Sequence, residues 1–378
     1  AIADGAQPAN DGAGYVLRRI LRRAARYGRQ LDQHDPFIYR LISTVADLLG
    51  QSYPEIVAKN AHISMVVQSE EESFGRTLDR GLDIFERLSQ KNEISGADAF
   101  QLYDTFGFPL DLTQLMARER GLHVDVDGFQ VALENQRQRA RKASRTQFAA
   151  TEGVADVLDA EHSAFIGYDE LETEGAVVFA GADDEGNVQL FLDRTPFYAE
   201  SGGQVGDRGV IEGSDFTVDI VDTVKGRGGI MHVGRLSTGA ADAISGTVRA
   251  RVDGERRLAG ARHHTSTHLL HEALRRILGP HVAQMGSLVA PERLRFDFSH
   301  FSPIDPAQLE EIESLVNAEI RADREISTFE ESLEKAKSMG AQALFGEKYE
   351  ERVRVVRIGD FSLELCGGTH VNSTGEIG

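Results

Sequence analysis

The chain has 378 residues, of which 41% are hydrophobic and 27% charged, and at ~150 residues per domain this length predicts two or three domains. This composition excludes a disordered chain, and no apolar run approaches the ~20 residues that a membrane-spanning helix needs. The net charge of −19 argues against nonspecific nucleic-acid binding over the whole surface, and the single cysteine excludes an internal disulfide and favours a cytoplasmic protein.

Residues 1–150 are predicted to form a helical domain. In residues 15–27, apolar side chains recur on one arc at 100° per residue. The opposite arc carries five arginines, which are Arg18, Arg19, Arg22, Arg23 and Arg26. Because the guanidinium fork matches phosphate, these side chains are candidate contacts to a nucleic-acid backbone. A solvated helix face and a membrane-surface helix are the alternatives.

Residues 151–252 differ in texture, since short apolar runs alternate there with turns rich in Gly and Asp. Strands at this spacing predict a small antiparallel β-barrel or a sandwich. Gly202 and Gly203 lie in this region, and two adjacent glycines let the backbone approach a ligand closely. A tight β turn explains the same pair equally well.

Residues 253–378 are predicted to be α+β. A helix covers residues 264–278, a strand 293–298, and a hairpin 352–365 that turns at Gly359-Asp360. The fold class expected for the whole chain is therefore multidomain α+β, with a helical domain, a barrel, and a zinc-binding α+β domain truncated at its C-terminus.

The last third carries the strongest chemical pattern. His264 and His268 stand at i and i+4, one helical turn apart, and Cys366 and His370 flank a Gly-Gly turn about 100 residues later. Two such pairs complete a tetrahedral zinc set. A buried structural thiol with unrelated histidines is the alternative, and His263 and His271 are near enough to compete as ligands.

Five motifs together resemble the alanyl-tRNA synthetase family. They are residues 10–19 (NDGAGYVLRR), 102–109 (LYDTFGFP), 195–204 (TPFYAESGGQ), 264–270 (HTSTHLL) and 366–370 (CGGTH). The resemblance covers essentially the whole chain and implies the middle of such an enzyme: the tRNA-recognition region, the β-barrel and the editing domain. The catalytic domain that uses ATP and Mg²⁺ would precede residue 1, and an oligomerisation region would follow residue 378.

The resemblance also implies a function. The parent enzyme would attach alanine to tRNA(Ala), and this segment would recognise the acceptor stem and hydrolyse mischarged Ser-tRNA(Ala) and Gly-tRNA(Ala). Asn10 and Asp104 match the residues that read the G·U pair, although a helix cap and a turn explain them locally. The zinc ligands match His264, His268, Cys366 and His370, and Gln284 matches a glutamine associated with editing.

Several groups are candidates for sensing the hydroxyl of a mischarged serine. They are Gln284, Thr265, Thr267 and the backbone of Gly202 and Gly203. Because four protein ligands leave no open position on zinc, either one ligand yields or the metal orders the site. A tRNA-binding segment with a structural zinc and a general zinc hydrolase of small esters are the competing hypotheses.

Overall fold

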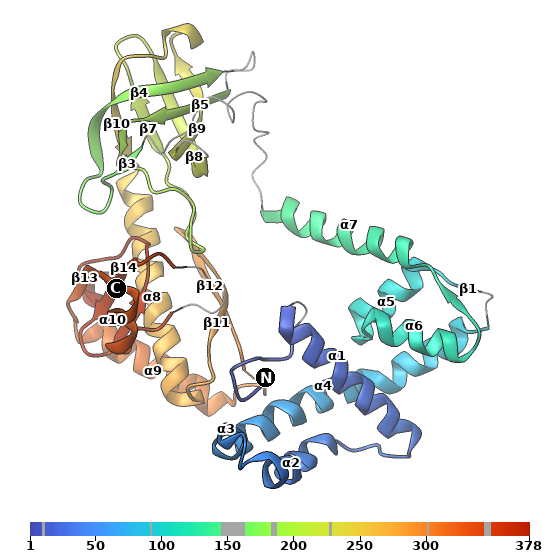
Figure 1. Ribbon diagram of the computed structural model, residues 1–378. Helices are drawn as coiled ribbons and strands as arrows, with labels where there is room; N and C mark the ends of the chain where they lie inside the picture. The colour runs from blue at the N-terminus through green and yellow to red at the C-terminus, as the bar shows by residue number, and fades with distance from the viewer. Residues whose placement is uncertain are drawn as a thin grey trace. The chain divides into compact units, whose positions relative to one another are not determined.

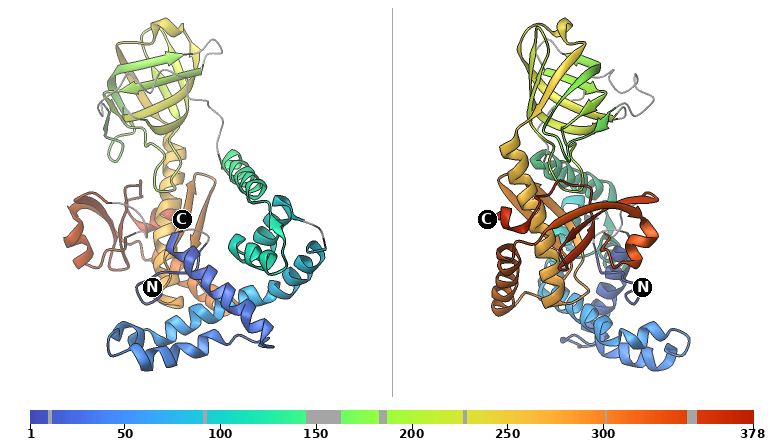
Figure 2. Two further views of the ribbon diagram at one scale, coloured as in Figure 1. Left: turned by 45° about the vertical axis from the view of Figure 1, so that its right-hand side comes forward. Right: turned by 90° about the vertical axis from the view of Figure 1, so that its left-hand side faces the viewer.

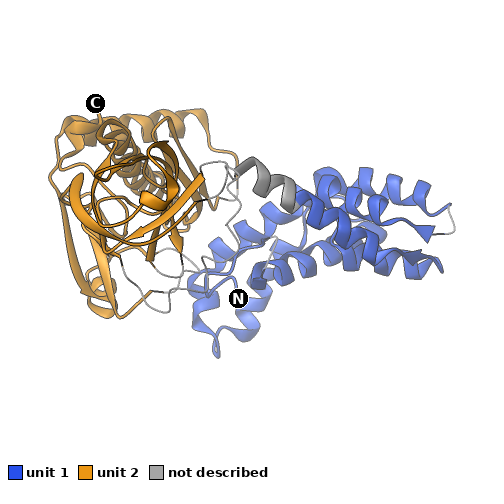
Figure 3. Ribbon diagram, turned by 90° about the horizontal axis from the view of Figure 1, so that it is seen from above, with its two compact units in different colours: residues 1–147 blue, residues 148–378 orange. Residues whose placement is uncertain are grey.

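The computed structural model describes residues 1–9, 12–90, 93–144, 163–182, 187–226, 229–300, 302–343 and 349–378. The chain divides into two compact units, residues 1–147 and 148–378 (Figure 3). No helix in the described ranges is both long enough and apolar enough to cross a membrane.

The first unit is built almost entirely of helices. They are α1 (Gly12–Gln30), the 3₁₀ turn η1 (Ile38–Arg40), α2 (Leu41–Leu49), α3 (Pro54–Ala58), α4 (Asn60–Leu88), α5 (Gly96–Phe106), α6 (Leu110–Glu119) and α7 (Val126–Ser144). Two short parallel strands, β1 (Glu93–Ile94) and β2 (His123–Val124), join α4 to α5 and α6 to α7.

The long helix α4 supplies the core of this unit, because Phe74, Leu78 and Phe85 recur on one face and are buried against α5 and α6. Local signals set the ends of α5. The Ser95 side chain accepts a hydrogen bond from the Asp98 amide at its start, and Gly107 ends the helix in the left-handed conformation, at φ 70°.

The second unit begins with a closed antiparallel barrel in the strand order β10-β4-β5-β9-β8-β7. The strands are β4 (Glu172–Ala182), β5 (Asn187–Leu192), β7 (Gly209–Glu212), β8 (Thr217–Gly226), β9 (Gly229–Thr238) and β10 (Thr247–Val252). Buried residues of β5 and β8, such as Leu190 and Val218, fill its interior. The parallel pair β3 (Ala164–Phe165) and β6 (Arg194–Thr195) lies beside it, and the 3₁₀ turn η3 (Ala241–Ala243) precedes β10.

Helix α8 (Gly254–Leu278) follows β10 directly and starts at Asp253, whose side chain accepts from the Arg256 amide. It runs away from the barrel between two sheets (Figures 1 and 2). One is the hairpin β11 (Gln284–Ala290) and β12 (Arg293–Phe298); the other is the antiparallel sheet β13 (Ile326–Ser332), β14 (Arg352–Ile358) and β15 (Ser362–Leu365). Helices α9 (Pro306–Arg321), α10 (Leu333–Ser338) and the turn η4 (Thr374–Ile377) complete the unit.

The mixed helix-and-sheet class and the closed barrel are confirmed. The predicted strand 293–298 is β12, and the predicted hairpin is β14 paired with β15. The proposed domain boundaries at residues 150 and 252 stay predictions, and the second of them lies within the second compact unit.

Candidate metal centre

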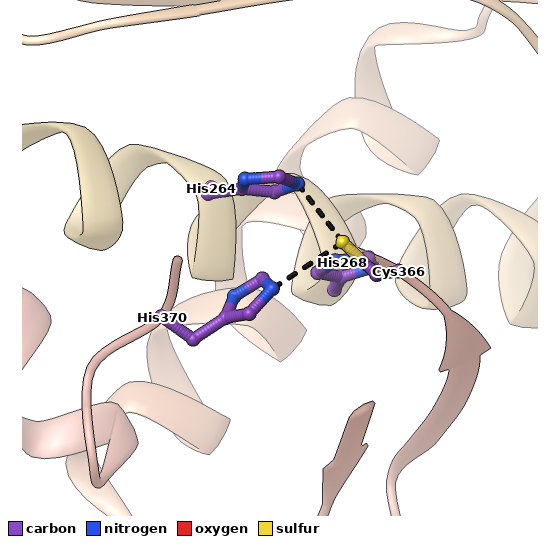
Figure 4. A group of neighbouring side chains, drawn as sticks. All are labelled: His264, His268, Cys366 and His370. Carbon is purple, nitrogen blue, oxygen red and sulfur yellow. Dashed lines mark hydrogen bonds between the residues drawn. The ribbon is translucent and has the colours of Figure 1, made fainter. Parts of the chain in front are cut away.

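Four side chains from two distant segments converge in the second unit (Figure 4). His264 and His268 project from α8, and their rings are stacked 5.3 Å apart. Cys366 and His370 come from the turn that follows β15. One nitrogen or sulfur atom from each residue lies within 4.8 Å of the others, and Cys366 Sγ is 3.3 Å from His264 Nε2 and 3.4 Å from His370 Nε2.

The outer nitrogen of each imidazole has a protein partner. The Nδ1 contacts are His264 to Gln204 Oε1 at 2.7 Å, His268 to Glu364 Oε2 at 2.7 Å, and His370 to Thr265 Oγ1 at 3.2 Å. With Nδ1 engaged, each ring turns Nε2 toward the common centre, which is how metal-ligating histidines are oriented.

One polar atom on the inner side of the cluster has no hydrogen-bond partner. Within the described residues, His268 Nε2 is buried and has no hydrogen-bond partner. Leaving a buried polar atom unpaired costs free energy, so the atom needs an explanation. Three imidazole nitrogens and one thiolate match the donor set and count of a closed zinc site, and the residues therefore fit this metal.

The electrostatics favour a charged sulfur at this centre. Burial acts to raise the pKa of the Cys366 thiol, but His264, His370 and His268 lower it well below its usual range. Burial likewise opposes ionisation of Glu364, yet the attraction of His268 and His271 holds its pKa at about 2. A thiolate is the form of cysteine that binds metal. Because the pKa of Cys366 is already lowered, metal binding needs little additional free energy to remove the thiol proton.

The turn that carries Cys366 is held by two side chains that sequence reasoning missed. Arg354 donates to the carbonyl oxygens of Cys366 at 3.0 Å and Gly368 at 2.8 Å, and the Tyr168 hydroxyl donates to Gly367 O at 2.7 Å. The Arg354 guanidinium lies 4.1 Å from the centre of the Tyr168 ring. No motif marked these contacts, because Tyr168 lies 199 positions from Gly367 and Arg354 reaches the turn from β14, the strand that pairs with β15.

A cavity of about 720 Å³ opens beside the cluster. Three residues of the cluster, Cys366, His264 and His268, line it, as do three other predicted site residues, which are Gly202, Thr267 and Gln284. Gln284 Nε2 donates to Ser287 Oγ at 3.2 Å, and Ser287 Oγ in turn donates to Gly202 O at 3.3 Å. The structure thus brings Gln284 and the Gly-Gly turn together through Ser287.

The remaining candidates in this unit take different places. Thr265 is fully buried, does not line the cavity and contacts His370, and its role as a sensor of the serine hydroxyl stays a prediction. Gly203 packs against Ser287 rather than facing the cavity. The possible competing ligands lie outside the cluster: His263 contacts Ala290 O at 2.7 Å and His271 contacts Glu364 at 3.0 Å.

The arginines of α1 differ most from expectation. Arg22 contacts Glu70 at 2.6 Å, Arg23 contacts Asp111 at 2.5 Å, and Arg26 pairs with Glu119. The other two form longer ion pairs, Arg18 with Glu70 at 3.3 Å and Arg19 with Asp111 at 3.6 Å.

Helix α1 buries residues from both of its arcs, since Leu21 of the apolar arc is buried as well. Part of the predicted apolar arc faces outward, since Val16 and Ile20 are 44% and 59% exposed. Arg26, from the predicted solvent face, is buried. Carboxylates on α4 and α6 explain the exchange, because they give the guanidinium groups partners inside the unit.

The two residues predicted to read the base pair fare differently. Asp104, on α5, accepts a hydrogen bond from Gln136 Nε2 at 2.7 Å. It lines a cavity of about 360 Å³ together with Arg18 and Arg22. Asn10 lies outside the described residues.

Comparison with known proteins shows what this chain is similar to. The protein-family model of class II (A) tRNA synthetases matches residues 1–256. The family model of the threonyl and alanyl tRNA synthetase second additional domain matches residues 353–378. Alanine--tRNA ligases from Pelotomaculum thermopropionicum, Stenotrophomonas maltophilia and Legionella pneumophila are 48%, 49% and 46% identical over the whole chain. The chain spans 44–45% of the length of each, and these matches do not confirm the predicted place in the middle of the enzyme.

Proposed function

Because this chain belongs to the alanyl-tRNA synthetase family, we propose that it hydrolyses mischarged Ser-tRNA(Ala) and Gly-tRNA(Ala) at the His264–Cys366 cluster. We further propose that its longer parent attaches alanine to tRNA(Ala) with ATP. The observation that carries the editing proposal is the unpaired, buried His268 Nε2 among three other potential ligands, at the wall of a cavity.

A synthetase for alanine has a chemical need for such a site. A pocket that admits alanine also admits glycine, and it rejects one added hydroxyl poorly. A second site that binds the serine hydroxyl by hydrogen bonds can remove the error after attachment. The polar cavity wall next to the cluster meets this requirement.

Two side chains on that wall suit the recognition step. Gln284 uses its amide nitrogen on Ser287, which leaves its amide oxygen to accept from a seryl hydroxyl. The Thr267 hydroxyl donates to His263 O at 2.9 Å and can still accept a hydrogen bond. Gly202 presents bare backbone to the cavity, since a Cβ there would meet no atom within 4 Å.

His264, His268, Cys366 and His370 would hold the zinc ion, which supplies a fixed positive charge and Lewis acidity next to the ester. The chain's own residues keep this place ordered: Glu364 and Gln204 fix two of the imidazoles, and Arg354 fixes the turn.

One observation favours a second candidate function. Four protein side chains already complete a tetrahedral set, which is typical of structural zinc. In that case the segment binds tRNA and does not hydrolyse the ester by itself.

The first unit is proposed to bind the acceptor stem through Asp104 and the two most exposed arginines of α1, Arg19 and Arg23. The Arg22 and Arg26 side chains are only 13% and 7% exposed and are less available to phosphate. Asn10 keeps its proposed role in reading the base pair.

The decisive experiment measures deacylation of Ser-tRNA(Ala) by the chain, with Ala-tRNA(Ala) as the control substrate. We expect hydrolysis of the first and sparing of the second. Cys366→Ala should lower the rate at least about 100-fold, because loss of even an orienting partner of a metal ligand costs 10–100-fold. If the wild type binds zinc and tRNA but leaves Ser-tRNA(Ala) intact, the structural-zinc function is the correct one.

A further inference from the structure

The side chain of Gln204 joins three segments at the metal centre. It comes from the turn between β6 and β7, and it is 3% exposed. Its Oε1 lies 2.7 Å from His264 Nδ1 on α8 and accepts from the Thr369 amide at 3.0 Å. Its Nε2 donates to Thr369 Oγ1 at 2.8 Å. One buried amide therefore links the glycine turn, α8 and the Cys366–His370 turn.

These contacts determine which form of His264 is present. A backbone N–H only donates, so the Gln204 atom that faces Thr369 N must be the oxygen. The same oxygen faces His264 Nδ1, which must then carry the hydrogen. The lone pair of that imidazole is left on Nε2, on the side of Cys366.

Backbone hydrogen bonds hold the turn that carries Gln204 in one position against β11. The amide of Val289 donates to Gly203 O at 2.8 Å, and the amide of Val205 donates to Val289 O at 3.0 Å. A Cβ on Gly203 would lie 2.6 Å from Ser287 O, and its φ of 85° is one that only glycine adopts without strain. Any displacement of this turn moves Gln204 away from His264.

We propose that Gln204 is a positioning residue that couples the packing of the Gly202-Gly203 turn against β11 to metal binding at His264. The inference rests on the proposed zinc site. Because such coupling is reciprocal, zinc tightens the turn and a displaced turn weakens zinc binding. The cavity wall formed by Gly202 then has its final shape only when the metal is bound.

The first test measures zinc affinity of the full chain by competition with a coloured chelator. Gln204→Met removes the acceptor at equal length, and we expect affinity to fall 10–100-fold. Gln204→Glu keeps an acceptor for His264 and Thr369, so its affinity should stay near that of the wild type. Gln189→Met is the matched control, since Gln189 is 6% exposed and lies on the barrel strand β5.

The second test separates coupling from a local effect. Gly203→Ala touches no ligand, yet it should weaken zinc binding in the wild type and have no further effect in Gln204→Met. Gly246→Ala controls for strain alone, because Gly246 also has a positive φ, 78°, and has free space around it.

The outcomes distinguish this inference from the proposed function. Equal zinc affinity in the wild type and Gln204→Met overturns the inference alone, while a wild type that binds no zinc overturns both. Failure of Gln204→Glu to restore affinity also overturns it. If Gln204→Met does not fold, Gly203→Ala against Gly246→Ala decides: weaker zinc binding only in Gly203→Ala supports the coupling, and equal affinities reject it.

Discussion

The arginines of α1 and the histidine cluster of α8 differ in whether their polar atoms find partners within the protein. On α1, Arg22 and Arg26 are each neutralised by a carboxylate of the same unit. On α8, His268 has a partner for Nδ1 and none for Nε2 among the described residues. The difference teaches that a run of charges does not by itself identify a binding surface, whereas a buried nitrogen without a partner that lies among three other potential ligands points to a metal.

Metal removal should give the largest contrast between the two units. Zinc held at 1,000 times its Kd adds about 4 kcal/mol to the unfolding free energy of the unit that binds it. Within residues 1–9, 12–90 and 93–144 no group of potential ligands was found, so the first unit should not respond. Hydrogen exchange with and without chelator should show lost protection in α8 and unchanged protection in α4. Equal losses in both helices would contradict the contrast.

His232 sharpens the comparison, because it is a buried histidine whose two nitrogens are both engaged. It contacts Thr195 Oγ1 at 2.7 Å and Leu190 O at 3.1 Å. Burial lowers the pKa of His232 from 6.5 to about 4. The unfolded chain therefore takes up the proton first as the pH falls. The contribution of neutral His232 to the unfolding free energy is complete above pH 6.5 and is lost toward pH 4.

The size of this effect is about 3 kcal/mol in the unfolding free energy of the second unit. Denaturant unfolding between pH 7 and 4 measures it, and His232→Gln should remove that part of the slope. His123→Gln is the control, since the His123 side chain is 79% exposed. A slope that persists in His232→Gln would mean that other groups carry it.

Arg22→Ala and Arg23→Ala test the α1 side of the comparison. Removing Arg22 leaves the buried Glu70 with only the longer contact to Arg18, so the unfolding free energy should fall by about 2–3 kcal/mol. The Arg23 side chain is 45% exposed, and its loss should cost less than about 1 kcal/mol. If Arg22→Ala instead unfolds like the wild type and binds tRNA weakly, Arg22 belongs to the tRNA-binding face together with Arg19 and Arg23, and its ion pair with Glu70 is not structural.

Short-range patterns made much of the fold predictable. Alternation of apolar residues indicated β12, and the i, i+4 spacing placed His264 and His268 on one side of α8. The cluster of His264, His268, Cys366 and His370 was also predictable, because the single cysteine and a nearby histidine share a glycine turn. These features depend on neighbours in the chain.

The orienting residues could not be predicted in this way. Gln204, Glu364 and Arg354 act on ligands through contacts made only by the folded chain, and no spacing rule connects them. The burial of arginines on α1 has the same origin, because the carboxylates that attract Arg22 and Arg26 lie 48 and 93 positions away. Tertiary ion pairs outweighed the amphipathic pattern.

The separation of the two ligand pairs also has a consequence during synthesis. Cys366 follows His264 by 102 positions, with β11 to β15 between them. At about 5–20 residues per second, a ribosome delivers the two histidines roughly 5–20 s before the thiol. During that interval the nascent chain carries His264 and His268 without Cys366 and His370. For the proposed metal site, this order means that all four side chains are present only after every strand of the barrel has been synthesised.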